Sequence, residues 1–140
     1  MLLLSIHPEF ASAILDGTKR VEFRRRSPRQ APAGSKLAIY ASSPTCALVA
    51  TATIDSYIEA TPMSLWRKCR EFGGISHSEF MNYFDGAEKA VGILLRSVQP
   101  LSMQIGLGEL RTWWPGFHPP QQFAYLDDGE LATKLRLIAA

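Results

Sequence analysis

The sequence predicts an α+β fold, a small mixed or antiparallel β-barrel with flanking helices. Strand-like segments follow one another directly in the middle of the chain, and this order suits a barrel better than a doubly wound sheet, in which helices separate the strands. The 140 residues, of which 46% are hydrophobic and 20% charged, match the size and composition of one globular domain. We therefore expect a single domain over residues 1–140.

Strands are indicated by apolar runs and by the alternation of apolar with polar residues. Val21 and Phe23 alternate with charged side chains, which predicts a half-buried strand with Glu22 and Arg24 on its other face. Pro100 is expected to end the fifth strand, since proline has no N–H to donate. Six strands are predicted in this way: Met1–Ile6, Arg20–Arg26, Leu37–Ala41, Ala47–Tyr57, Ala87–Val98 and Phe123–Tyr125.

Helices are indicated by apolar residues at helical spacing and by capping residues. Pro8 suits a first helical turn, and Gly17 suits a helix end. Ser76 and Glu79 have the spacing of a capping box. The same criteria predict four helices, a C-terminal turn and a segment that docks back onto the domain: Pro8–Asp16, Met63–Glu71, Ser76–Phe84, Gly108–Trp114, Glu130–Lys134 and Leu135–Ile138.

Several classes of protein are excluded by composition. No segment approaches the roughly 18 apolar residues that span a bilayer, and the run Met1–Ile6 lacks the basic flank of a signal peptide. We therefore expect a cytoplasmic protein with no membrane partner. Cys46 and Cys69 have neither the spacing of metal ligands nor that of a disulfide framework, and the three histidines are scattered. No metal and no cofactor are expected.

Positive charge is concentrated in one segment. Lys19–Lys36 holds seven basic residues and one acid, whereas the rest of the chain holds eight basic and twelve acidic residues, and the net charge is only +2. A patch of this kind favours polyanionic partners such as nucleic acid. The alternative explanation is that these charges keep an exposed strand edge soluble.

Both ends of the chain resemble the ASCH domain family, a branch of the PUA-like superfamily. The family pattern is a strand, a helix that ends at glycine, and then G-x-K-x-x-E-x-R, which is matched by Gly17, Lys19, Glu22 and Arg24. The segment Trp114–Leu126 is similar to the family's closing loop and strand. The resemblance spans essentially the whole chain. It implies a small β-barrel and a cleft beside the signature that receives RNA or a nucleobase.

The signature residues have chemistry that suits such a ligand. Lys19 is a mobile cation, Arg24 is a rigid fork for phosphate or base acceptors, and Glu22 can accept from an exocyclic amine. Strict alternation places Lys19 and Glu22 on opposite faces, so both line one cleft only if the chain turns at Thr18–Arg20. A surface ion-pair cluster of little energetic consequence is the alternative interpretation.

Aromatic and hydroxyl side chains are candidates to extend this cleft. Tyr40 would offer a stacking ring beside two serines, and the aromatic group around Pro119 suits unpaired bases. Packing in the core is the competing interpretation for Tyr40 and for most of that group. The full set of predicted binding residues is Ser5, Lys19, Glu22, Arg24, Arg26, Tyr40, Ser42, Ser43, Trp114 and His118.

We expect RNA or a modified nucleoside to bind at the signature, with DNA as a further candidate ligand. One branch of the family resembles hydrolases of N4-acetylcytidine, which use a Lys, a Thr three residues later and a remote Glu. Here Glu22 stands at the Thr position, and Glu71 and Glu79 lie in the region of the remote Glu. Other relatives are described as ribonucleases. Catalysis by Lys19 and Glu22, as an amidohydrolase or a ribonuclease, is therefore one alternative, and a protein–protein adaptor is another.

Overall fold

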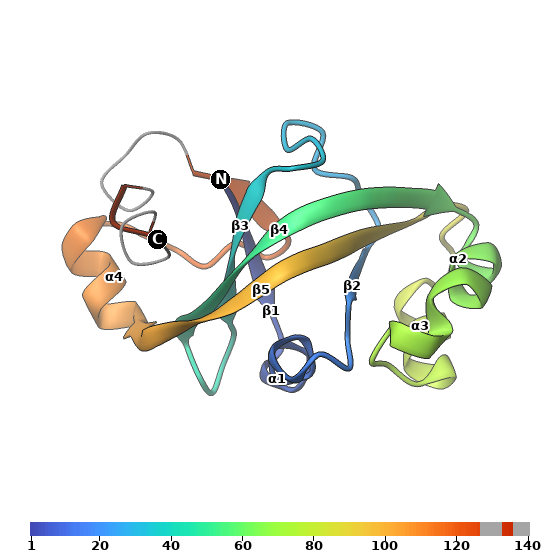
Figure 1. The fold of residues 1–140 in the computed structure, drawn as a ribbon, viewed down its shortest axis with the longest axis horizontal. Helices are drawn as coiled ribbons and strands as arrows, with labels where there is room; N and C mark the ends of the chain where they lie inside the picture. Colours follow the sequence, from blue (N-terminus) through green and yellow to red (C-terminus); the bar gives the residue numbers. More distant parts are fainter. Residues whose placement is uncertain (127–132, 136–140) are drawn as a thin grey trace.

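A six-stranded sheet forms the centre of the molecule (Figure 1). The structure, a computed structural model, describes residues 1–126 and 133–135. The strands are β1 (Leu2–Ile6), β2 (Val21–Arg24), β3 (Lys36–Ala41), β4 (Ala47–Ala60), β5 (Ala90–Gly106) and β6 (Phe123–Tyr125). They lie in the order β2-β5-β4-β3-β1-β6, with β1 and β3 parallel and all other neighbours antiparallel. This mixed sheet confirms the predicted α+β class.

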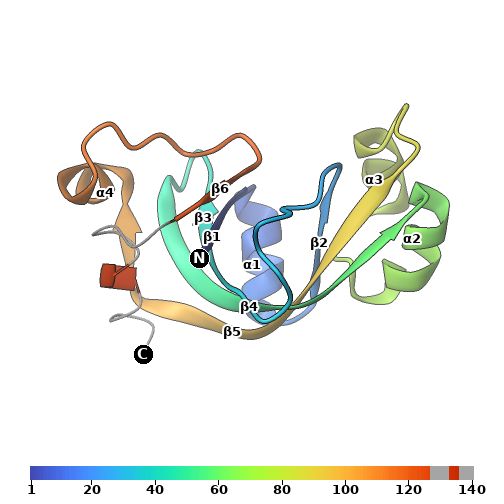
Figure 2. The same ribbon diagram turned by 90° about the horizontal axis from the view of Figure 1, so that it is seen from above.

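The sheet curls into half of a barrel because its two longest strands are bent. β4 has 14 residues and β5 has 17. The register between them shifts at three places: Leu48/Ala50, Thr51/Thr53 and Ile54/Ser56. Such irregularities bend and twist a strand pair. Figure 2 shows helix α1 (Pro8–Asp16) lying inside the resulting curve.

The remaining helices lie at the two ends of the sheet (Figures 1 and 2). They are α2 (Pro62–Cys69), the 3-10 helix η1 (Arg70–Phe72), α3 (His77–Tyr83) and α4 (Leu107–Trp113). α2 and α3 lie together at one end, and α4 lies at the other. The predicted N-cap of α3 is confirmed, because the Ser76 hydroxyl accepts from the Glu79 N–H at 3.1 Å; the Glu79 carboxylate accepts from that hydroxyl at 3.0 Å rather than from the Ser76 N–H of a full capping box.

Three apolar clusters hold these elements together. The largest fills the curve of the sheet and includes Ile14 of α1. The second packs Leu110 of α4 against the nearby parts of β4 and β5. The third lies under α2 and α3 and includes Val21 and Phe23, which share one face of β2 as predicted. The opposite face of β2 is left to Glu22 and Arg24.

β5 differs from its prediction by continuing through Pro100 to Gly106. Pro100 lies opposite Ala50, beside one of the register shifts. This part of β5 also lies beyond the four residues that pair with β2, so it is an edge strand. Proline is tolerated at edges and bulges, and it therefore does not end the strand here. Helix α4 accordingly begins at Leu107 rather than at Gly108.

β2 is shorter and more buried than predicted. It covers only Val21–Arg24, and all four residues are buried, so the expectation of a half-buried strand is wrong. The charged face of β2 is covered because it turns toward β1 and the segment before β6.

The predicted C-terminal turn at 130–134 and docking segment at 135–138 fall mainly on residues 127–132 and 136–140, which lie outside the described residues. Leu135, which is described, is fully buried in the second apolar cluster. Within the described part of the chain, no helix has the length and hydropathy needed to cross a membrane.

The packing of α1 inside the curved sheet yields a stability prediction. Ile14 is 1% exposed, whereas its neighbour Leu15 is 37% exposed. Ile14→Ala should lower the free energy of unfolding by about 2–5 kcal/mol, because it leaves a cavity that the sheet cannot fill. Leu15→Ala, on the same helix, should cost clearly less. Urea unfolding of both variants tests this, and equal losses would contradict the packing described here.

Candidate functional site

A sharp turn after α1 brings Lys19 to the same side of the molecule as Glu22. Gly17 ends α1 with a φ of 87°, and the Lys19 N–H then donates back to the Ala13 carbonyl oxygen at 3.0 Å. The alternation of faces along a strand therefore begins only after Lys19, so it does not force Lys19 and Glu22 onto opposite faces. The turn that the sequence required at Thr18–Arg20 is present, and Lys19, Glu22 and Arg24 line one cavity.

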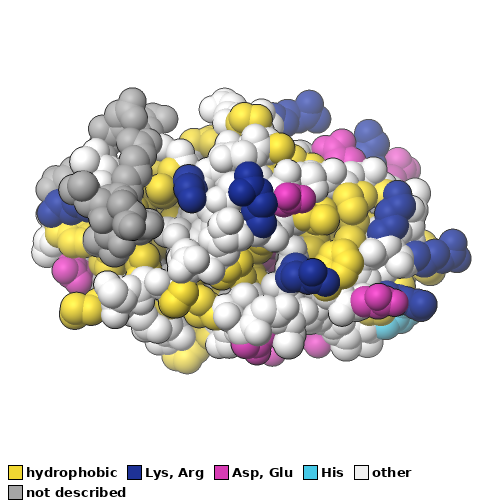
Figure 3. Space-filling model, in the orientation of Figure 1, with side chains coloured by type: hydrophobic (Ala, Val, Ile, Leu, Met, Phe, Trp, Pro, Cys, Tyr) yellow, Lys and Arg dark blue, Asp and Glu magenta, His cyan; other side chains and the backbone are white. Residues whose placement is uncertain are grey.

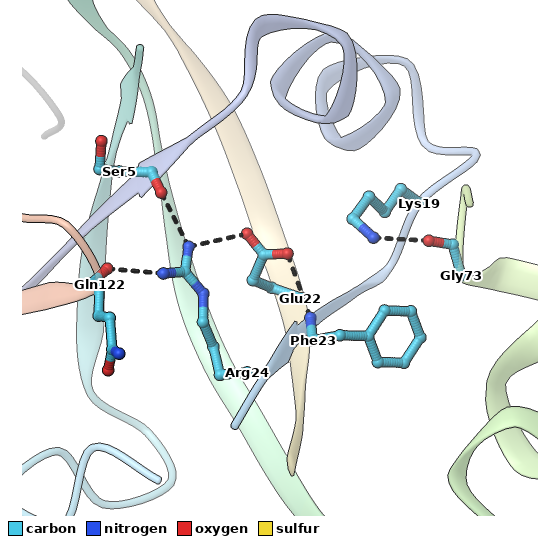
Figure 4. Close-up of polar contacts among 7 residues, drawn as sticks. All are labelled: Ser5, Lys19, Glu22, Phe23, Arg24, Gly73 and Gln122. Atoms are coloured by element: carbon cyan, nitrogen blue, oxygen red, sulfur yellow. Dashed lines mark hydrogen bonds and ion pairs between the residues drawn. The ribbon is translucent and has the colours of Figure 1, made fainter. Parts of the chain in front are cut away.

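Lys19 is a buried cation. Its side chain is 1% exposed, and its Nζ donates to the Gly73 carbonyl oxygen at 2.6 Å (Figure 4). The same nitrogen lies 5.1 Å from the ring centroid of Phe10 and 4.8 Å from that of Phe23. Burial lowers the pKa of Lys19, and the negative charge of Glu22 opposes this effect only in part. The amine therefore loses its proton more readily than an ordinary lysine.

The turn after η1 is shaped to accommodate this lysine. Gly74 has a φ of 61°, and a Cβ built on it would lie 2.6 Å from the Cβ of Lys19. Any larger residue would strain the turn and displace the lysine. The Gly73-Gly74 pair thus provides both a carbonyl partner and the space for Lys19.

Arg24 joins the two edges of the curled sheet. From β2, its Nη2 donates to the Ser5 carbonyl oxygen of β1 at 2.9 Å, and its Nη1 donates to the Gln122 carbonyl oxygen at 2.7 Å (Figure 4). Nη2 also pairs with Glu22 Oε2 at 3.2 Å, and Glu22 Oε1 accepts the Phe23 N–H at 3.1 Å. Three bonds occupy much of the guanidinium, so Arg24 positions the Glu22 carboxylate more than it presents itself to a ligand.

The cavity has a volume of about 390 Å³. It is lined by residues of α1, β1, β2 and α3, of their flanking loops and of the segment before β6: Ser5, Ile6, His7, Glu9, Phe10, Lys19, Glu22, Phe23, Arg24, Ile75, Glu79, Tyr83 and Gln121. Two of these are cations and three are carboxylates, so the expected basic cleft is not basic in its lining. Aromatic rings and hydrogen-bonding groups are its main features. A cavity of this size and composition suits a small, flat, polar ligand.

Several predicted site residues lie outside this cleft. Tyr40 is 1% exposed and packs against Phe117 in the second apolar cluster, so the prediction that its ring is available for stacking is wrong. Ser42 and Ser43 follow β3 and do not line the cavity, although the Ser42 N–H donates to the Ile6 carbonyl oxygen at 2.9 Å.

Trp114 and His118 are not brought to the cleft either. Trp114 directly follows α4, which lies at the end of the molecule opposite α2 and α3 (Figure 1). Its ring packs on Phe117, and neither Trp114 nor His118 lines the cavity. Arg26 lines a separate groove.

The structure adds residues that the sequence did not single out. Phe10 and Tyr83 supply rings to the cleft, and His7 and Gln121 supply polar groups. Glu79, rather than Glu71, lines the cavity. In the sequence, Glu79 had a sufficient structural role at the start of α3. Its position in the lining of the cavity is what makes it a candidate site residue. Among residues 1–126 and 133–135, no group of three or more His, Cys, Asp or Glu is placed to hold a metal ion.

The bridging role of Arg24 can be tested by its removal. Arg24→Gln should lower the free energy of unfolding by roughly 3–5 kcal/mol, because it leaves Glu22 as a buried, unpaired charge and releases two carbonyl oxygens. Arg26→Gln, an exposed arginine on the same stretch, should change it by less than about 0.5 kcal/mol. Denaturant unfolding of both variants measures this. A small loss of unfolding free energy in both would show that Arg24 does not hold the two edges of the sheet together.

The lowered pKa of Lys19 predicts how stability depends on pH. Between that pKa and the ordinary value of 10.5, the unfolded chain holds a proton that the folded chain has lost. The contribution of Lys19 to stability should therefore rise with pH across this window. Unfolding of the wild type and of Lys19→Met from about pH 7 to about pH 10 measures it, since other groups cancel in the difference. A difference that is flat or falls with pH would show that the lysine is not desolvated.

Comparison with known proteins identifies the family. A model of the ASCH domain matches residues 4–102. A Zymomonas mobilis protein named ASCH domain-containing ribonuclease is 36% identical over 124 residues, which cover 89% of this chain and 82% of that protein.

Solved structures give the same result. The crystal structure of an ASCH protein from Zymomonas mobilis superposes with a TM-score of 0.89 at 34% identity, covering 97% of this chain and 94% of that one. The N-terminal domain of Staphylothermus marinus McrB, with a TM-score of 0.56 and 11% identity over 98% of this chain and 91% of that one, shares the fold alone. The resemblance to the ASCH domain family is thus confirmed, and the chain belongs to that family.

Proposed function

We propose that this protein binds RNA and takes one unpaired nucleobase, ordinary or modified, into the cleft. The observation that carries the proposal is the pairing of a buried donor, Lys19, with a fixed acceptor, Glu22, in a cavity of about 390 Å³ that also contains Phe10 and Tyr83. Proteins read RNA sequence mainly on unpaired bases, by stacking and by hydrogen bonds to the base edge. A duplex would not fit such a cavity.

The donor and acceptor favour bases that carry an exocyclic amine. Lys19 uses one N–H on Gly73, which leaves two for a ligand in the protonated form and one in the neutral form. Glu22 is held by the Phe23 N–H and by Arg24, and its carboxylate oxygens retain lone pairs for an amine donor. Cytosine and adenine present an amine next to an acceptor, whereas uracil presents a carbonyl oxygen where the amine would be.

The relationship to a protein named a ribonuclease supports RNA as the ligand class. This support does not depend on the geometry of the cleft, because it comes from the name of a homologue, whereas the geometry is that of this chain. The two together favour RNA over DNA and over a protein partner. An adaptor would have no use for a buried lysine between two aromatic rings.

Hydrolysis is a second candidate function, which the lowered pKa of Lys19 favours. A neutral amine can accept a proton from water that attacks an acylated cytosine, or from a ribose 2′-hydroxyl that attacks the adjacent phosphorus. In the first reaction the acyl carbon gains the water oxygen and the base nitrogen leaves with a proton. In the second, the 5′ oxygen leaves and takes the proton. Glu79 lines the same cavity and could serve as the remote carboxylate of such a reaction.

The preference for amine-bearing bases is the direct test of the binding proposal. Wild-type protein should bind short oligocytidine or oligoadenosine RNA about 5- to 100-fold more tightly than oligouridine, the range that one bidentate base contact provides. Glu22→Gln should reduce this preference, because an amide can either donate or accept. Fluorescence anisotropy measures it, and circular dichroism checks that the variant folds. Equal affinity of the wild type for all three oligomers would refute the assignment of the cleft.

The same samples decide between binding and hydrolysis. Release of cytidine from N4-acetylcytidine, or shortening of the RNA, that is present in the wild type and absent in Lys19→Met would establish catalysis. Met lacks the amine but keeps an unbranched apolar stem, one atom shorter than lysine, to pack against Phe10 and Phe23. Binding without turnover in the wild type would leave a recognition domain.

A further inference from the structure

We infer that the groove lined by Arg25, Arg26, Arg29 and Lys89 holds backbone phosphates that flank the nucleotide in the cleft. The ligand is then a strand of RNA rather than a free nucleoside. This inference rests on the proposed function and specifies its substrate class.

The lining of the cleft carries too little positive charge to supply the phosphate contacts of a nucleic acid. Its lining holds the cations Lys19 and Arg24 against the acids Glu9, Glu22 and Glu79. Nucleic-acid affinity comes largely from the neutralisation of phosphates by Lys and Arg. The cleft alone cannot supply this, since its lysine is buried and its arginine is bonded to two carbonyl oxygens and a carboxylate.

The second cavity has the opposite balance. It measures about 320 Å³ and is lined by four cations and one acid, together with a serine and two apolar residues: Arg25, Arg26, Ser27, Arg29, Glu59, Lys89, Val91 and Phe123. The cations come from two separate parts of the chain, the segment after β2 and the residue before β5. Lysine and arginine are spread over the middle of the face in Figure 3 and over the end that holds α2 and α3.

Three of these cations are available to a ligand. Among the described residues, Arg26, Arg29 and Lys89 make no ion pair and no hydrogen bond, and all three are exposed. Arg25 is different, because its Nε and Nη2 donate to the carbonyl oxygens of Tyr83 and Asp85 at 3.1 and 2.7 Å. It therefore keeps its charge at the groove while it fixes the end of α3.

Residues close to one another in the chain line the cleft and the groove at two places. Arg24, the last residue of β2, lines the cleft, and the next residue, Arg25, lines the groove. On the other side, Gln121 lines the cleft and Phe123 lines the groove. Arg24 bonds to the carbonyl oxygen of Gln122, which stands in the chain between Gln121 and Phe123. A strand that places a base in the cleft can thus lay its next phosphates in the groove.

Protection of a strand edge does not account for this arrangement. β2 is an edge strand of the sheet, and charges along it would suffice to discourage pairing with another chain. Lys89, however, precedes the neighbouring strand β5 and still lines the same cavity. Four cations from two parts of the chain, with one carboxylate among them, are the arrangement expected at an anion site.

Salt dependence tests the inference. For oligocytidine RNA, replacing both Arg26 and Lys89 by Gln removes two phosphate contacts. The loss of affinity between about 50 and about 200 mM salt should become roughly seven-fold smaller than in the wild type, because each contact contributes about 0.7 to the logarithmic slope. The matched control, Arg67→Gln with Lys68→Gln on exposed positions of α2, should leave the slope unchanged. Free cytidine should bind the groove variant as it binds the wild type.

The outcomes separate this inference from the function on which it rests. An unchanged slope in the groove variant, with the wild-type preference for cytidine and adenosine intact, would overturn the groove and leave the cleft standing. The same fall in slope in the control would also overturn it, since general charge would then explain the result. A slope that is reduced in the groove variant and not in the control would support the inference. If the wild type showed no preference among the bases, the result would count against the cleft alone.

Discussion

The guanidinium of Arg24 is the contact on which the architecture of this domain depends. A curled sheet with two open edges needs something to hold those edges in register, and main-chain pairing cannot do so here because β2 and β1 are not neighbours. Arg24 reaches the Ser5 and Gln122 carbonyl oxygens across this gap, and only a planar fork with several donors can bind both while it pairs with Glu22. Arg24 and Glu22 both line the cleft, so this bridge forms part of its wall.

The bridge also accounts for the chemistry of the cleft. It orients the Glu22 carboxylate, and the turn after α1 buries Lys19 beside it. Burial without a dedicated carboxylate partner favours the neutral amine, so the site combines a fixed acceptor with a lysine of lowered pKa. Such a pair suits a base edge better than a phosphate. The free cations of the neighbouring groove suit phosphates, and for this reason we propose that the two cavities divide the recognition of a nucleotide between them.

Much of the fold follows from local patterns. The apolar run of β1, the Pro8 to Gly17 frame of α1 and the Ser76–Glu79 capping box predicted their elements because each depends on short-range chemistry. Pro100 misled the prediction for the opposite reason. Its effect depends on where β5 lies in the sheet, and an edge position next to a register shift allows the strand to continue to Gly106.

The sequence by itself determined the fold class, the family signature and the residue types of the candidate site, since alternation and spacing are local properties of the chain. Only the tertiary structure decided which charges serve which purpose. Strand alternation gives the face of a residue, but the curvature of the sheet decides what that face meets. All three of Arg24, Arg26 and Tyr40 were predicted as binding residues. In the structure, Arg24 bridges the edges of the sheet, Arg26 lines the groove and Tyr40 is buried in the core.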